Sequence, residues 1–181
     1  MKKLLLITGD LACGKSTFGE ILAKRYNSAA FYKDKIKEIL GDTIGFESRE
    51  DNLKLSYATM EIMTHIFIET AKVGSDLILE ANFKEHEMER IYTMAEDAGY
   101  DMLTLVLTAD MDVIYQRFVN RIENENRHPV HISGFDGYDS LKYYIDRGRE
   151  QKCFGNILKL NANDFSYQEK FDEIDRFMRW R

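Results

Sequence analysis

Gly9-Asp10-Leu11-Ala12-Cys13-Gly14-Lys15-Ser16 matches, at every fixed position, the pattern Gly-x-x-x-x-Gly-Lys-Ser/Thr. The stretch follows the apolar run Lys3 to Thr8. It precedes a helical pattern whose expected inner face carries Phe18, Ile21 and Leu22. A strand, a glycine turn and a helix start, in that order, aim backbone N–H groups and the positive end of a helix dipole at one spot. The sequence therefore predicts a phosphate-binding loop after the first strand.

The side chains of this loop have separate expected tasks. Lys15 can reach the β- and γ-phosphates of a nucleotide, and the Ser16 hydroxyl can ligate Mg²⁺. Cys13 is expected to be a small filler and not a nucleophile. The predicted cofactors are ATP and Mg²⁺, although the sequence does not separate ATP from GTP. The residues expected to bind the nucleotide here are Gly9, Leu11, Ala12, Cys13, Gly14, Lys15, Ser16 and Thr17. The alternative interpretation is an incidental glycine-rich turn.

Composition limits the partners of the chain. Its 181 residues suit one domain, spanning 1–181, and 25 basic against 31 acidic residues give a net charge of −6. This acidic balance disfavours long nucleic acids and anionic membranes, which need a broad positive field. Cys13 and Cys153 form no Cys-x-x-Cys pair, and no apolar run is long enough to span a membrane. We expect a cytoplasmic protein, either monomer or homodimer.

Apolar runs alternate with helical patterns along the chain. Five such runs separated by helices predict right-handed crossovers, and hence an α/β fold with a mostly parallel sheet between helical layers. In the helix after Asp110, Ile114, Phe118 and Ile122 recur at the spacing of one buried face. Residues 41–49 are expected to be loop. The expected strands are 3–8, 29–33, 76–81, 102–107 and 157–160, and the expected helices are 14–26, 34–40, 51–73, 85–98, one from 110, one from about 139 to 151, and 168–180.

Four stretches together resemble the small-molecule kinase branch of the P-loop proteins. They are the phosphate loop, Phe31 to Lys37, Leu77 to Asn82, and Arg117 to His131. This branch includes nucleoside-monophosphate, shikimate and gluconate kinases, chloramphenicol phosphotransferase and the polynucleotide 5′-kinase domain. The resemblance implies a three-layer fold with a five-stranded parallel sheet in the order 2-3-1-4-5, and a helical lid at about 123–140.

The resemblance also implies roles for residues at strand ends. Asp34 stands where related kinases carry the base that accepts the proton of the acceptor hydroxyl; the alternative is a helix N-cap. Lys37 stands where the polynucleotide-kinase pattern has an arginine, and lysine lacks the planar guanidinium group that binds phosphate through two hydrogen bonds. Glu80 resembles the acid that holds Mg²⁺, where the family more often has Asp; because Glu is longer, the alternative role is a contact with the acceptor. Asn82 is either part of the acceptor pocket or a plain turn residue.

The arginines of the fourth stretch are candidates for phosphate contacts. Arg117 and Arg121 are four residues apart and share a helix face, and Arg127 begins the irregular segment. In similar kinases, lid arginines neutralise charge in the transition state because their fork matches phosphate oxygens. We assign this catalytic task to Arg121 and Arg127, and a nucleotide contact to Arg117. The alternative is a solvated helix face. The histidines at 128 and 131 have no partners at metal-ligand spacing.

These residues predict an enzyme that moves the γ-phosphoryl group of Mg·ATP to a hydroxyl of a small molecule. Lys15, Asp34, Arg121 and Arg127 would be catalytic, and Ser16 with Glu80 would hold the metal. Three alternatives stay open: a regulatory GTPase, a nucleotide-binding module without transfer, and a zeta-toxin-like or polynucleotide kinase. Asn161 to Asp164, after the last strand, is a weak indication of a site for the nucleotide base.

Overall fold

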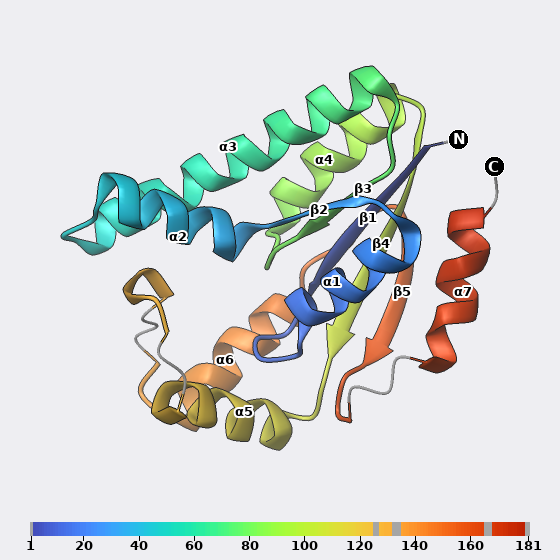
Figure 1. Cartoon of the computed structure of the whole chain (residues 1–181). Helices are drawn as coiled ribbons and strands as arrows, with labels where there is room; N and C mark the ends of the chain where they lie inside the picture. The colour runs from blue at the N-terminus through green and yellow to red at the C-terminus, as the bar shows by residue number, and fades with distance from the viewer. Residues whose placement is uncertain (1, 125–126, 132–134, 165–167, 180–181) are drawn as a thin grey trace.

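The computed structural model describes residues 2–124, 127–131, 135–164 and 168–179. Five parallel strands form one sheet in the order β2-β3-β1-β4-β5, as predicted (Figure 1). The strands are β1 (Lys2–Gly9), β2 (Ala29–Tyr32), β3 (Leu77–Glu80), β4 (Tyr100–Thr108) and β5 (Asn156–Asn161). The helices are α1 (Lys15–Tyr26), α2 (Lys33–Ile44), α3 (Arg49–Val73), α4 (Glu85–Asp97), α5 (Met111–Asn124), the short 3₁₀ helix η1 (Pro129–His131), α6 (Tyr138–Arg149) and α7 (Gln168–Arg179).

The central strand β1 is buried on both faces, which is why it reads as a continuous apolar run. Leu5 and Ile7 face one core, which they share with Phe18 of α1 and with apolar side chains of α5, α6 and α7. Leu4 and Leu6 face the other core, which α3 and α4 cover. The alternation of strand side chains thus divides the helices between two layers, one on each side of the sheet.

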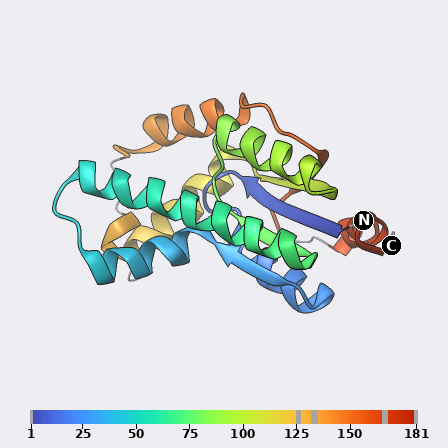
Figure 2. The same ribbon diagram turned by 90° about the horizontal axis from the view of Figure 1, so that it is seen from above.

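The strand register brings the chemistry to one edge of the sheet. Glu80, the last residue of β3, lies opposite Ile7 of β1 and Tyr32 of β2. Gly9 ends β1 opposite Leu107 of β4. Because all strands are parallel, their carboxyl ends meet there. The hairpin of α2 and the first half of α3 projects beyond this edge (Figures 1 and 2).

Three expectations for the helices are wrong in detail. Residues 41–44 were expected to be loop but continue α2, which ends at Gly45 with φ +81°. Glycine at position 41 is atypical of a helix interior, but here it allows close packing, because a Cβ there would lie 3.3 Å from the His128 ring. Ile21 and Ile122 were assigned to buried faces, yet both are exposed, because these helices contact the core along narrower stripes.

No helix in the described ranges is both long and apolar enough to cross a membrane. The helix expected over 51–73 ends after Val73 as predicted, at Gly74, which has φ +65° and an N–H that donates to the Ala71 carbonyl. Of the predicted lid at 123–140, residues 125–126 and 132–134 lie outside the described part of the chain. The described part of that segment comprises the end of α5, η1 and the start of α6.

Candidate functional site

The loop between β1 and α1 has a backbone that few sequences can adopt. Gly9 has φ +123°, and a Cβ there would lie 2.0 Å from the Leu107 carbonyl oxygen. Gly14, the N-cap of α1, has φ +73°, and Ala12 has φ +57°. Left-handed residues in such a turn arrange successive N–H groups into an anion-binding concavity. The geometry fits a phosphate group at the start of α1, where the helix dipole also favours it.

Lys15 lies folded over this loop. Its Nζ donates hydrogen bonds to the carbonyl oxygens of Asp10, at 2.6 Å, and Gly9, at 3.3 Å. Only 8% of the side chain is exposed. A buried ammonium group beside a ring of N–H donors adds positive charge where phosphate oxygens would lie. The structure therefore places the Lys15 ammonium group beside the backbone of the loop.

Ser16 and Glu80 form the oxygen pair of the site. The Ser16 Oγ donates to Glu80 Oε2 at 2.9 Å, across 64 residues of sequence. Glu80 is 5% exposed, and this burial raises the pKa of its carboxyl, against the opposing effects of Lys15 and Ser16. A hydroxyl and a carboxylate are the hard oxygen ligands that Mg²⁺ prefers. Residues and geometry both fit a magnesium ion beside the phosphate loop.

Cys13 and Thr17 complete the predicted loop. The Cys13 side chain is fully buried, and burial raises the pKa of its thiol to about 11. The thiol stays protonated at neutral pH, which suits a packing role and excludes an activated nucleophile. Thr17 is exposed in the first turn of α1.

An ion pair that the sequence analysis missed holds the start of the loop. Arg149, the last residue of α6, donates from Nη2 to Asp10 Oδ2 at 2.6 Å and to the Ala109 carbonyl at 2.6 Å. The Ala109 N–H also donates to Asp10 Oδ2, at 3.2 Å. The Asp10 carboxylate is buried, so it has to be paired. No sequence signal links residues 139 positions apart, because the contact depends on how α6 packs.

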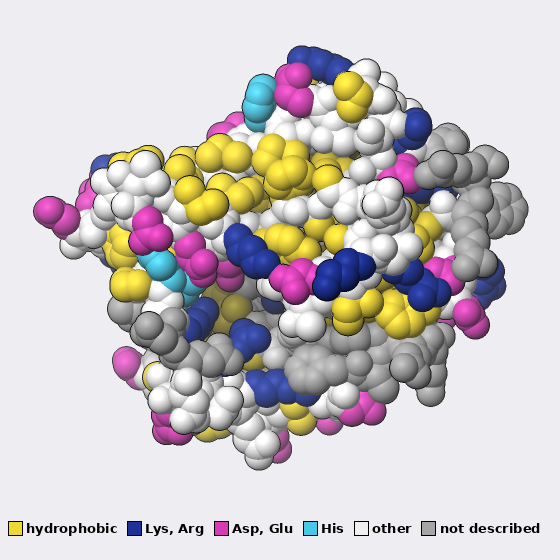
Figure 3. Space-filling view, viewed as in Figure 1, with side chains coloured by type: hydrophobic (Ala, Val, Ile, Leu, Met, Phe, Trp, Pro, Cys, Tyr) yellow, Lys and Arg dark blue, Asp and Glu magenta, His cyan; other side chains and the backbone are white. Residues whose placement is uncertain are grey.

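A cavity of about 400 Å³ opens beside the loop, and we call it the acceptor cavity. The structure brings Asp34, Asn82, Arg121 and Arg127 together in its walls. In the space-filling view, basic side chains line a hollow below α2 (Figure 3). The other lining residues come from the loop, α2, α3, α5, the segment around η1, and α6: Leu11, Ala12, Lys37, Asn52, Leu53, Ser56, Phe118, Val130, His131, Phe135 and Tyr144.

Asp34 reaches this cavity from the first turn of α2. The N-cap of that helix is Tyr32, so the alternative role of Asp34 as the N-cap is wrong. The Asp34 side chain is exposed and accepts no hydrogen bond from any residue within the described ranges. Its carboxylate oxygens are accessible to a ligand in the cavity. Arg121 approaches from α5, and Arg127 from the segment before η1.

Residues of α2, α3 and η1 form part of the wall of the acceptor cavity, and hydrogen bonds connect η1 to both helices. Asn52 of α3 accepts from Lys37 Nζ at 2.6 Å and donates to the Val130 carbonyl at 2.9 Å. His128 Nε2 lies 2.9 Å from Asp42 Oδ1, and His131 Nε2 lies 2.9 Å from Glu38 Oε1. Each histidine therefore contacts a carboxylate of α2. Among the residues that the structure describes, no three potential metal ligands cluster.

Arg117 does not line the acceptor cavity. Its guanidinium donates to the carbonyl oxygens of Ala162, at 2.7 Å, and Asn163, at 2.6 Å. It therefore fixes the turn after β5, the segment in which the sequence analysis saw a weak indication of a base site. Asn163 also bridges to Asp110, through its own Nδ2 and Oδ1. Arg117 thus contacts the segment after β5, whereas Arg121 and Arg127 line the acceptor cavity.

The comparisons with known proteins agree with this geometry. A family model described as an AAA domain matches residues 5–136. A candidate kinase from Chloroflexus aurantiacus J-10-fl is 25% identical, with a TM-score of 0.83 over 98% of this chain and 97% of its own. No curated protein matches the chain.

Two further solved structures share the fold at lower identity. The tunicamycin resistance protein of Deinococcus radiodurans is 14% identical, with a TM-score of 0.62 over 100% of this chain and 98% of its own. The shikimate kinase of Bacteroides thetaiotaomicron is 18% identical, with a TM-score of 0.56 over 96% and 95%. At these identities the likeness concerns the fold alone.

Proposed function

Because the chain belongs to the AAA domain family and has the fold of the P-loop small-molecule kinases, we propose that it transfers the γ-phosphoryl group of Mg·ATP to a hydroxyl of a small molecule. One observation carries the proposal. Leu11 and Ala12 of the phosphate loop line the acceptor cavity, and so do Asp34, Arg121 and Arg127. A phosphate donor on the loop and a hydroxyl near Asp34 would face each other in the same cavity.

The phosphate loop binds and orients the donor. When bound, Mg²⁺ supplies neutralisation of the phosphate charge, and Ser16 with Glu80 would hold it. Lys15 exchanges its contacts with the Gly9 and Asp10 carbonyls for phosphate oxygens. These are fixed donors in a largely buried site, and such preorganised electrostatics provide much of the catalysis in phosphoryl transfer.

Asp34 acts on the acceptor. Its exposed carboxylate accepts the hydroxyl proton and orients the oxygen for in-line attack on the phosphoryl group. Arg121 and Arg127, which line the same cavity, contribute positive charge toward the oxygens of the transferring group. Holding both reactants in one cavity removes much of the entropic barrier to their meeting.

The test is Mg·ATP consumption by the purified protein with pooled metabolites, including antibiotics and nucleotide sugars. Lys15→Ala is the blank, and it should lose at least about 10²-fold in turnover with its fold intact. Asp34→Asn should lower kcat by roughly 10²–10⁴-fold with little change in ATP affinity, since a general base acts on the chemical step. Far-ultraviolet circular dichroism checks both folds.

The outcomes of this assay distinguish a kinase from a nucleotide-binding module and test the role of Asp34. A pool that gives Lys15-dependent ADP and a product heavier by one phosphoryl group supports the kinase and identifies the acceptor. An Asp34→Asn variant that turns over like wild type would remove Asp34 from the mechanism. Tight ATP binding without any phosphorylated pool favours a nucleotide-binding module, or a macromolecular acceptor. The net charge of −6 disfavours a long nucleic acid in that role.

A further inference from the structure

A second cavity, of about 200 Å³, lies next to the acceptor cavity, and we call it the side chamber. Leu11, Asn82 and Tyr144 line both cavities. We propose that the side chamber receives an apolar, ring-sized group of the phosphoryl acceptor. The acceptor would then be a hydroxylated molecule with an apolar group next to its reactive hydroxyl, and not a polyol or a sugar phosphate. This inference rests on the proposed function.

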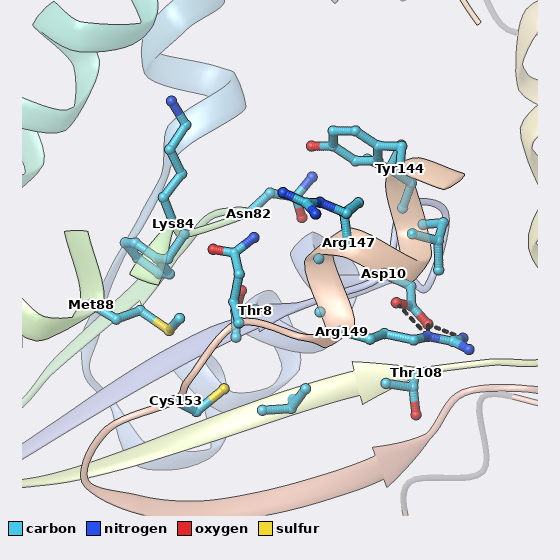
Figure 4. Close-up of a pocket in the computed structure, with 17 residues that line it drawn as sticks. Thr8, Asp10, Asn82, Lys84, Met88, Thr108, Tyr144, Arg147, Arg149 and Cys153 are labelled. Atoms are coloured by element: carbon cyan, nitrogen blue, oxygen red, sulfur yellow. Dashed lines mark hydrogen bonds and ion pairs between the residues drawn. The ribbon is translucent and has the colours of Figure 1, made fainter. Parts of the chain in front are cut away.

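The walls of the side chamber are mainly apolar. Phe83, Met88 and Ile145 are each less than 5% exposed to solvent, and Val106 and Cys153 add further apolar surface. Figure 4 shows Met88 and Cys153 at one end of the chamber, with the Lys84 amine pointing away from them. Walls of this kind favour an apolar ligand, because they remove its surface from water without offering polar partners.

The charges of Asp10 and Arg149 in the wall neutralise each other. The Asp10 carboxylate is paired with Arg149, as Figure 4 shows, and also accepts from the Ala109 N–H. Gln151 uses its side-chain carbonyl to accept from the Glu85 N–H at 2.8 Å. Arg147 and Lys84 also line the chamber; the Arg147 side chain is 67% exposed, and the Lys84 amine points away from Met88 and Cys153 (Figure 4). The end of the chamber formed by Met88 and Cys153 is therefore apolar.

The size and position of the chamber match a substituent and not a nucleotide. Its volume is comparable to the roughly 150 Å³ cavity that binds benzene in an engineered protein core. Gly9, Asp10 and Leu11 of the first half of the phosphate loop line it, but Lys15 and Ser16 at the start of α1 do not. It adjoins the acceptor cavity through shared residues, and one molecule can therefore occupy both.

Asn82 marks the point where the polar part of the ligand would begin. Its Oδ1 is buried and has no hydrogen-bond partner among the residues that the structure describes. A buried hydrogen-bond acceptor without a donor costs about 1–3 kcal/mol of stability. Native proteins therefore keep few such groups, and each one calls for an explanation. Asn82 lies where the two cavities meet, and a ligand hydroxyl there would donate to its oxygen. This observation is independent of the apolar walls.

The two cysteines provide a direct readout of occupancy. Cys153 lines the chamber and is partly exposed, whereas Cys13 is fully buried with the pKa of its thiol raised to about 11 by burial. Alkylation by iodoacetamide should modify Cys153 and spare Cys13, which serves as an internal reference. The probes are 1-phenyl-1,2-ethanediol and glycerol, each at millimolar concentration, and the rate is followed by mass spectrometry.

We expect the phenyl diol to slow alkylation of Cys153 at least threefold and glycerol to leave the rate unchanged. Val106→Phe should fill the chamber and abolish protection by the diol, while Val106→Ala, its matched control, should keep it. Val106→Ile is the smaller replacement if the Phe variant does not fold, and it should weaken the protection. A thermal shift with Mg·ATP verifies that each variant retains its phosphate loop.

Three results would overturn the proposal. They are equal protection by glycerol and the phenyl diol, undiminished protection in folded Val106→Phe, or protection by Mg·ATP alone that equals that of the diol. Failure of the proposed function looks different. In that case wild type would show no Lys15-dependent ADP with any pool, whether or not the diol protects Cys153.

Discussion

At the scale of the residue, Glu80 shows how folding and metal binding compete for one side chain. Its carboxylate is buried at the end of β3, and burial raises its pKa above the ordinary value of 4.5. An acid whose pKa is raised by folding stabilises the protein fully only below that ordinary value. The stabilisation disappears as the pH rises through the raised pKa. At neutral pH, ionised Glu80 therefore lowers the free energy of unfolding unless a cation is bound.

Replacing Glu80 by its neutral isostere should separate these two effects. Glu80→Gln should raise Tm in the absence of Mg²⁺ at pH 7.5, by about 2–4 °C for each kcal/mol of relieved desolvation. It should also lower Mg·ATP-dependent turnover by roughly 10²-fold or more. Differential scanning fluorimetry with EDTA, and a turnover assay, measure the two quantities.

Glu87→Gln is the matched control for this substitution. Glu87 is also buried, but its carboxylate accepts from the Lys84 N–H at 2.7 Å and lies 3.6 Å from Lys33 Nζ. Glu87→Gln removes the ion pair with Lys33, so this variant should lower Tm. If Glu80→Gln lowered Tm as Glu87→Gln does, the cost assigned to ionised Glu80 would be wrong.

The sequence predicts individual site residues where their role depends on local order. The spacing of Gly9, Gly14 and Lys15 specifies a loop whose backbone the structure reproduces. Asp34 and Asn82 follow strands directly, and parallel strand ends meet at one edge. Arg149 could not be predicted, since its contact with Asp10 is made by a helix that begins 128 residues later. Such contacts depend on tertiary packing, which a local pattern does not encode.

At the scale of the element, the contact between η1 and the α2–α3 hairpin shapes the acceptor cavity. Asn52 is its centre, because it bonds to Lys37 of α2 and to the Val130 carbonyl of η1. Lys37 is buried, and burial lowers the pKa of its ammonium group. Gly41 lets η1 approach α2 closely. This packing also explains why the expected loop at 41–44 is helical.

Asn52→Leu should release η1 from this hairpin. The substitution keeps the size of the side chain but removes both hydrogen bonds, and it leaves Lys37 without its acceptor. We expect a loss of about 1–3 kcal/mol in the free energy of unfolding. Amide hydrogen exchange in 128–131 should become at least tenfold faster. Lys54→Ala, on an exposed face of the same helix, is the control, and equal exchange in the two variants would refute the contact's role.

At the scale of the whole molecule, the parallel sheet and the division of helices into two layers follow from the alternation of strands and helices, whereas the strand order was implied by the resemblance to the small-molecule kinases. The prediction of a parallel sheet in the order 2-3-1-4-5 is confirmed. What the pattern did not predict is the extent of buried surface on single helices. Ile21 and Ile122 have the right spacing for burial, yet they are 41% and 56% exposed. Periodicity indicates a face, and tertiary packing decides how wide the buried stripe is.

Nucleotide binding should stabilise the whole chain. A ligand at 100 times its Kd adds about 2.7 kcal/mol, which for a protein of this size corresponds to a rise in Tm of roughly 5–10 °C. We expect this shift with Mg·ATP, and less than a third of it in Lys15→Ala. Mg²⁺ alone and ATP with EDTA are the controls in the thermal scan. An unchanged Tm in wild type at millimolar Mg·ATP would contradict nucleotide binding.

The walls of the acceptor cavity come mostly from segments that lie between strands. The α2–α3 hairpin and the segment around η1 add no strand to the sheet, whereas the phosphate loop continues β1, its central strand. Substitutions in those segments leave strand pairing unchanged. Natural selection can therefore exchange one set of walls for another without rebuilding the donor half of the molecule. A change of substrate during evolution then needs few mutations, and each intermediate can remain a folded protein.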